Sequence, residues 1–230
     1  MDKDYAEYLI NKTRDDYNLI SDDFSRTRMN AWEEIKFLFD NYLKAGDKAL
    51  DIGCGNGRYY DLIKSKGSFY TGLDNSGKLV EIARKMHPSA DFVLGEGLAL
   101  PFSDSYFNRI FAIAFLHHIP SKELRLKFLS EAKRTLSSGG TLIITVWKFH
   151  RIKEIFLLLK YTLLKLLGIS KLGFKDIFEP WANKTKRYYH WFSKRELENL
   201  AKQSGFKIIK SGIAKNKKNN RRNIYIVAEK

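Results

Sequence analysis

Five short apolar runs alternate with helix-forming segments between residues 48 and 147, and this alternation restricts the fold more than any other feature of the chain. The runs occupy residues 48–53, 68–74, 91–96, 108–115 and 141–147. Parallel strands joined by helical crossovers give this pattern, because each crossover returns the chain to the same edge of the sheet. The sequence therefore predicts an α/β protein with an open, mostly parallel sheet and helices on both faces.

The last part of the chain follows a different pattern. Residues 207–215 and 223–230 have the pattern of two strands around a basic turn, so we expect an antiparallel hairpin to finish the sheet. A length of 230 residues suits one such domain with an insertion. We predict a single domain over residues 1–230, made of N-terminal helices (1–45), a cofactor-binding core (46–150), an inserted lid or substrate-recognition segment (151–192) and a C-terminal helix and hairpin (193–230).

The composition is globular but strongly basic. Hydrophobic residues make up 44% of the chain, and 41 Lys+Arg against 26 Asp+Glu give a formal net charge of +15. This excess favours a polyanionic partner, either nucleic acid or an anionic membrane surface. The single cysteine, Cys54, excludes an internal disulfide and a cysteine-rich zinc site, and no metal site is predicted. The charged N-terminus lacks the apolar core of a signal peptide, so the expected location is the cytoplasm.

Residues 51–57, DIGCGNG, form a glycine-rich turn between a strand and a helix. Its glycines, Gly53, Gly55 and Gly57, allow the backbone to approach a ligand without intervening Cβ atoms. Asp51 adds a carboxylate at the strand end, which opposes a pyrophosphate and suits a ligand that carries a cationic amino group.

Two more acids end the next two strands. Asp74 can accept hydrogen bonds from both hydroxyls of a ribose, and Glu96 lies where it can reach an adenine amino group. Since the carboxyl ends of parallel strands meet at one edge of a sheet, we expect these acids and the glycine turn to lie in one row. Open α/β sheets bind their ligands at this edge.

These motifs together resemble those of the class I S-adenosylmethionine-dependent methyltransferases. ALDIGCGNG, the acid of GLDNS, GEGLALPF, AFLHHIP and SSGGTLIITVW occur in the order of that family and cover residues 46–147. The resemblance implies a Rossmann-like seven-stranded sheet in the order 3-2-1-4-5-7-6, with strand 7 antiparallel, and S-adenosyl-L-methionine as the cofactor. The residues expected around this cofactor are Arg28, Asp51, Gly53, Gly55, Gly57, Asp74, Asn75, Glu96, Gly97, Leu98 and Ala114.

Segments outside this core narrow the resemblance. YNLISDDFSRTRMNAW, Trp147, KDIFEPW and KRYYHWFSKRELENLAKQSGF are similar to the tRNA wobble-uridine carboxymethyl methyltransferases and to the matching domain of the AlkB-homologue fusion protein. The resemblance implies that the substrate is the carboxylate of 5-carboxymethyluridine in the tRNA anticodon loop. It also implies a small zinc-binding activator subunit as a partner. Residues 151–175 depart from the family pattern.

The candidate substrate residues follow from this chemistry. A carboxylate is already ionised at neutral pH and needs no general base, so positioning is expected to carry the rate. Arg187 offers a guanidinium for the substrate carboxylate or a phosphate, and His190 offers a hydrogen bond. Tyr188 and Tyr189 face opposite ways on an extended segment, so one of them is expected to meet the substrate. We expect His117 at the rim of the site.

Two features leave alternatives open. The basic turn at 215–222 is either a phosphate contact or a solvated hairpin tip. The helix expected at 151–167 is too short and too rich in lysine to span a bilayer, so it either covers the active site as a lid or contacts a membrane surface. The membrane alternative suits a small-molecule or lipid (quinone-type) methyltransferase. A third alternative is a non-catalytic RNA-binding module that keeps the fold.

Overall fold

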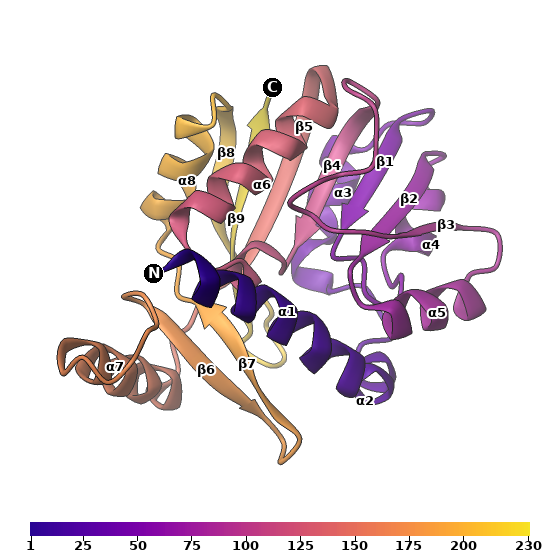
Figure 1. Ribbon diagram of the computed structural model, residues 1–230. Helices are drawn as coiled ribbons and strands as arrows, with labels where there is room; N and C mark the ends of the chain where they lie inside the picture. Colours follow the sequence, from indigo (N-terminus) through magenta and orange to yellow (C-terminus); the bar gives the residue numbers. More distant parts are fainter.

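The computed structural model describes residues 1–230 and is built around a seven-stranded sheet (Figure 1). Its strand order is β3-β2-β1-β4-β5-β9-β8, in which β9 pairs antiparallel with both neighbours and the first five strands are parallel. The strands are β1 (Lys48–Ile52), β2 (Phe69–Asp74), β3 (Asp91–Leu94), β4 (Phe107–Ile113), β5 (Leu136–Trp147), β8 (Lys207–Lys215) and β9 (Arg222–Glu229). Numbered within this sheet alone, the order is 3-2-1-4-5-7-6, which confirms the predicted fold.

Helices cover both faces of the sheet because the central strands are buried on both sides (Figure 1). Alternate side chains of each strand enter two separate cores: Leu50 packs with one layer, whereas Ala49 packs with the other. One layer contains α6 (Lys122–Thr135) and α8 (Lys194–Gln203), and the opposite layer contains α3 (Lys36–Tyr42), α4 (Tyr60–Lys64) and α5 (Gly77–Met86).

The N-terminal helices cross the carboxyl edge of the sheet (Figure 1). Helix α1 (Lys3–Leu19) is followed by α2 (Ser21–Thr27), and a short 3₁₀ turn η1 (Glu33–Ile35) precedes α3. The N-terminal helices expected within residues 1–45 are therefore interrupted by an irregular stretch that includes Arg28. A second 3₁₀ turn, η2 (Leu116–His118), follows β4.

A separate two-stranded hairpin, which the sequence did not predict, projects from the sheet beside α1 (Figure 1). It consists of β6 (Asp176–Trp181) and β7 (Thr185–His190), with Glu179 paired opposite Arg187. Helix α7 (Ile152–Leu166) packs mainly against β6. None of its residues is fully buried, and its outward face is apolar. No helix combines the length and apolar character needed to cross a bilayer.

Candidate active site

A cavity lies at the carboxyl ends of β1, β2, β3 and β4, with α1 and α2 contributing its other wall. Nine of the eleven residues expected around the cofactor line it, namely Arg28, Gly53, Gly55, Asp74, Asn75, Glu96, Gly97, Leu98 and Ala114. The ends of the parallel strands and the residue that follows α2, Arg28, bring together positions that are up to 86 residues apart in the chain.

The glycine turn lines this cavity with bare backbone. Gly53 has φ of +72°, and a Cβ atom there would lie 2.5 Å from the Phe115 ring, which also lines the cavity. Gly55 has φ of +58°, and its backbone N–H donates to the Asp74 carboxylate at 2.9 Å. Glycine is required at Gly53 for both reasons, the left-handed conformation and the lack of space.

The acids at the strand ends provide acceptors suited to a nucleoside. Asp74 is held in place by the N–H groups of Gly55 and Ser76, each at 2.9 Å, and burial raises the pKa of its carboxyl. Glu96 accepts a hydrogen bond from the Asn75 side chain at 3.3 Å. A bare glycine turn with two acids beyond it fits an adenosine-containing cofactor with a cationic amino group, which agrees with the expected S-adenosyl-L-methionine.

Asp51 and Gly57 lie outside the cavity lining, in contrast to the expectation. Asp51 is buried beneath the turn, where its carboxylate accepts a hydrogen bond from the Tyr70 hydroxyl at 3.2 Å. Burial raises the pKa of Asp51 to about 7. Gly57 lies against the Phe92 ring, so its role is close packing of the turn on the sheet. A strand-end position in the sequence does not distinguish a side chain that points to the ligand from one that points into the core below.

An outer groove adjoins the cavity and shares Arg28, Trp32, Trp147 and Arg187 with it. The groove is basic: its six cationic side chains are opposed by two glutamates, Glu154 and Glu179. The cations are Arg28, Lys148, Arg151, Arg187, Arg221 and Arg222. The inner cavity is therefore suited to the cofactor, whereas the outer groove is suited to an anionic substrate.

Tryptophan rings stack on the arginines at the junction of these two compartments. The Trp181 ring lies 4.2 Å from the Arg187 guanidinium and 4.8 Å from that of Arg28. The Trp32 ring lies 4.4 Å from Arg58 and 4.2 Å from Arg221. Such stacking fixes a guanidinium plane without using its N–H groups. Arg221 already donates through Nε and Nη2 to the buried Glu34 carboxylate.

Arg187 is buried at this junction with part of its hydrogen-bonding capacity unused. Its Nη1 lies 3.4 Å from the Tyr17 hydroxyl, and its Nη2 lies 3.3 Å from a carboxylate oxygen of Glu179. Its Nε has no partner, and neither has the indole Nε1 of Trp147, which lines both compartments. Burial opposes the charge of Arg187, but Tyr189, Tyr17 and Glu179 outweigh it and raise its pKa. The junction thus presents a fixed cation and two free donors.

The structure does not place His117 at the rim of the site, in contrast to the expectation. His118 lines the cavity, whereas His117 is buried beneath it against Trp147 and Tyr189. The Nδ1 of His118 donates to the Tyr188 carbonyl at 3.1 Å, and its Nε2 accepts from the Tyr17 hydroxyl at 2.9 Å. Burial, followed by the charge of Arg187, lowers the pKa of His118 to about 3, so the ring is neutral.

Alternation along β7 divides the Arg-Tyr-Tyr-His cluster between two environments. Arg187 lines both compartments. Tyr189, on the same face of the strand, stacks on Trp147 with 5.1 Å between the ring centroids. Tyr188 and His190 face the other way, so neither lines the cavity or the outer groove. This differs from the expectation that His190 meets the substrate. Tyr188 is the member of the tyrosine pair that points away from Arg187, because residues at odd and even positions of a strand point to opposite sides.

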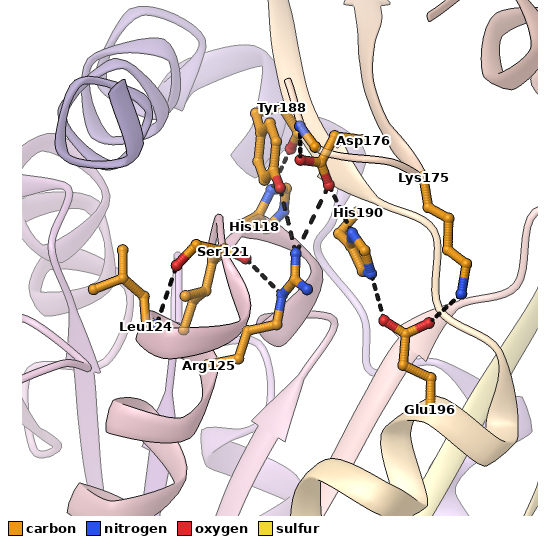
Figure 2. Close-up of polar contacts among 11 residues, drawn as sticks. His118, Ser121, Leu124, Arg125, Lys175, Asp176, Tyr188, His190 and Glu196 are labelled. Carbon is orange, nitrogen blue, oxygen red and sulfur yellow. Dashed lines mark hydrogen bonds and ion pairs between the residues drawn. The ribbon is translucent and has the colours of Figure 1, made fainter. Parts of the chain in front are cut away.

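Tyr188 and His190 instead belong to a polar network that is buried except at its Lys175 end. We call this network the hairpin latch: Arg125, Lys175, Asp176, Tyr188, His190 and Glu196 (Figure 2). His190 lies between two carboxylates, with Nδ1 2.6 Å from Asp176 and Nε2 2.7 Å from Glu196. Arg125 on α6 reaches the Tyr188 hydroxyl at 3.4 Å. The latch joins β6 and β7 to α6 and α8 and thereby fixes the strand that carries Arg187.

Several site residues were not singled out in the sequence. Tyr17 bridges His118 and Arg187 from α1, and Arg58 follows the glycine turn directly. Tyr17 lies in a segment that carries the family resemblance, which was the one signal pointing to it. No periodicity marks Trp32 or Phe115 as lining residues, because their roles depend on contacts between distant elements.

Comparisons with known proteins agree with this geometry. A family model described as a methyltransferase domain matches residues 50–144. The chain is 29% identical to the tRNA (carboxymethyluridine(34)-5-O)-methyltransferase of Schizosaccharomyces pombe, over 93% of this chain and 94% of the relative. It is 31% identical to a protein of Encephalitozoon cuniculi that is named as a methyltransferase, over 85% of this chain and 87% of the relative.

Solved structures share the fold. The crystal structure of an S-adenosylmethionine-dependent methyltransferase from Methanosarcina mazei aligns with a TM-score of 0.71 at 24% identity, over 87% of this chain and 98% of that one. A chain in the complex between the Haloferax volcanii Trm112 methyltransferase activator and a methyltransferase aligns with a TM-score of 0.67 at 16% identity, over 94% and 96%. Together with the family match and the cavity, these likenesses show that the chain belongs to the class I S-adenosylmethionine-dependent methyltransferases and is a relative of the tRNA carboxymethyluridine methyltransferases.

Proposed function

We propose that this methyltransferase esterifies the carboxylate of 5-carboxymethyluridine at the wobble position of tRNA. The observation that carries the proposal is the junction between the cofactor cavity and the basic groove, where buried Arg187 and Trp147 present unpartnered N–H donors. A guanidinium binds a carboxylate with two parallel hydrogen bonds, and such donors cost free energy when left unpaired. The similarity to a relative named for this reaction supports the same substrate.

S-Adenosylmethionine supplies a methyl group on a positively charged sulfur when it is bound. The residues proposed to hold it are Asp74 for the ribose, Glu96 for the adenine, the backbone of Gly53 and Gly55, and Arg28 for its carboxylate. A substrate carboxylate held at the junction would accept this methyl group directly, so no side chain of the site would have to move a proton.

The side chains at the junction suit a reaction without a general base. A carboxylic acid with a pKa of about 4 is ionised at neutral pH. His118 is neutral, but both of its ring nitrogens are engaged with Tyr17 and the Tyr188 carbonyl, so it is proposed to orient Tyr17 and Arg187. Arg187 is proposed to fix the carboxylate in line with the methyl group, and the surrounding aromatic rings exclude water.

The outer groove is proposed to hold the phosphates and bases of the anticodon loop. Arg222 from the basic turn lines the groove beside Lys148, whose backbone N–H donates to the Arg222 carbonyl at 2.9 Å, and Arg151 lines the same groove. Guanidinium and ammonium groups in these positions can bind phosphates on either side of the modified nucleotide. We also propose a small zinc-binding activator subunit as a partner, supported by the family resemblance and by the Haloferax volcanii complex.

The test is methyl transfer to tRNA that carries 5-carboxymethyluridine, compared with tRNA that lacks it. We expect Arg187→Ala to lower kcat/KM by 100-fold or more, as for removal of a buried charged contact, with unchanged cofactor affinity in calorimetry. Arg195→Ala, on the exposed side of α8, is the matched control and should transfer normally. Equal labelling of both tRNAs by the unaltered protein would reject the proposed substrate.

A further inference from the structure

The carboxylate of Glu179 already contacts the guanidinium of Arg187, which is the group that we propose binds the substrate carboxylate. It lies on β6 directly opposite Arg187 on β7, and its Oε2 is 3.3 Å from Arg187 Nη2. The Glu179 side chain is 21% exposed and lines the outer groove, whereas Arg187 is 4% exposed. Glu179 is therefore a carboxylate at the place where a second carboxylate is required.

The geometry of a guanidinium makes these two carboxylates compete. A carboxylate can bind with two parallel hydrogen bonds either at the Nε and Nη2 edge or at the Nη1 and Nη2 edge, so both arrangements use Nη2. Nη1 of Arg187 already points to the Tyr17 hydroxyl, and Nη2 to Glu179. A substrate carboxylate on Arg187 would place its oxygen and that of Glu179 around one nitrogen, where like charges repel strongly because the site is buried.

We propose that Glu179 is an internal competitor for Arg187: it holds the guanidinium in the free enzyme, yields it to the substrate carboxylate, and reclaims it once esterification has removed that charge. This inference rests on the proposed function. The exchange distinguishes substrate from product. The substrate acid binds Arg187 by displacing Glu179, whereas the neutral ester product is displaced from Arg187 by Glu179. Glu179 would thereby promote product release.

The surroundings of Glu179 allow it to give up Arg187. Burial raises the pKa of its carboxyl, and Glu154 acts in the same direction, whereas Arg187 opposes them. Lys153 and Arg151 of α7 also face it and favour its charged form. When Glu179 loses its contact with Arg187, it loses the largest of the influences that lower its pKa. Glu179 can then take up a proton as the substrate binds, so lower pH should favour binding of the acid.

The experiment measures equilibrium binding of an anticodon stem-loop that carries 5-carboxymethyluridine and of the same RNA as its methyl ester. Both are titrated by fluorescence anisotropy in the presence of S-adenosylhomocysteine, so no transfer occurs. In Glu179→Gln, we expect the acid to bind about five- to tenfold more tightly than in the unaltered protein and the ester affinity to change less. The acid affinity of the unaltered protein should rise from pH 7.5 to 5.5, and this dependence should disappear in the variant.

Unchanged acid-to-ester preference in Glu179→Gln, or weaker binding of the acid, would overturn the inference and leave Glu179 as a support for Arg187. Glu198→Gln, an acid of α8 outside the groove, is the control and should match the unaltered protein. Thermal unfolding and cofactor calorimetry verify that the variant is folded. Failure of the proposed function gives a different result, because the unaltered protein would then leave 5-carboxymethyluridine unmethylated whatever the behaviour of Glu179→Gln.

Discussion

The hairpin latch predicts a pH-dependent loss of stability when Glu196 is neutralised. Glu196 on α8 accepts hydrogen bonds from His190 at 2.7 Å and from Lys175 at 2.8 Å (Figure 2). Burial alone would raise the pKa of Glu196, but these two partners outweigh it and lower the pKa from 4.5 to about 2. Glu196→Gln keeps the shape of the side chain and removes the charge that both partners require.

The magnitude follows from that pKa. A lowering from 4.5 to about 2 corresponds to roughly 3 kcal/mol at about 1.36 kcal/mol per pH unit. The Glu196 side chain is 24% exposed, so solvent screening reduces this to about 1–2 kcal/mol. Because the folded-state pKa is depressed, the stabilisation is complete above about pH 4.5 and is lost as the pH falls toward about 2.

The assay is urea unfolding of both proteins between pH 3.5 and 8. Glu196→Gln should lower the free energy of unfolding by about 1–2 kcal/mol at pH 7, with a smaller difference at pH 3.5. It should also lower kcat for methyl transfer while cofactor affinity is retained, since the latch fixes the strand that carries Arg187. Glu198→Gln is the matched control on the same helix, where the acid contacts Ser211 and Lys194 and not the hairpin. An equal loss of stability in both variants, or a difference that does not change with pH, would refute the reasoning.

Two further predictions concern the glycine turn. Asp51→Asn should remove a pH dependence of the free energy of unfolding. Because burial raises the folded-state pKa of Asp51 from 3.8 to about 7, the unaltered protein loses stability as the pH rises through this range, by at most about 4 kcal/mol. Urea unfolding at pH 5 and pH 8 should therefore show a smaller loss of stability in the variant than in the unaltered protein. Gly53→Ala should weaken cofactor binding at least tenfold in calorimetry, because its Cβ would push Phe115 into the cavity. Gly46→Ala is the control, since Gly46 also has a positive φ, of +84°, but has no atom within 4 Å of the added Cβ. It shares only the cost of a left-handed conformation, about 1 kcal/mol, and should bind the cofactor normally. Equal cofactor affinity in the two alanine variants would argue against the proposed site.

The position of the cofactor cavity could be predicted largely from local patterns in the sequence. Apolar runs ending in Asp74 and Glu96 define parallel strands, and parallel strands place their carboxyl ends at one edge whatever the details of packing. The same argument failed for Asp51, which lies one residue before the end of β1 and points beneath the turn to Tyr70. The direction in which a side chain points at a strand end depends on the residue at which the backbone turns, and the spacing of residues in the sequence does not determine that residue.

The sequence by itself determined the fold, the family and the edge of the sheet at which the cofactor cavity lies, because these depend on periodicity and on short motifs that are contiguous in the chain. Only the tertiary structure decided which side of β7 faces the outer groove. Alternation implies that Tyr188 and Tyr189 point apart, but the choice between them was made by contacts with Arg125 and Trp147, which lie more than 40 residues away in the chain. Those contacts place Arg187 at the junction and His190 in the latch, and they exist only once the hairpin has packed against the helices and strands of the core.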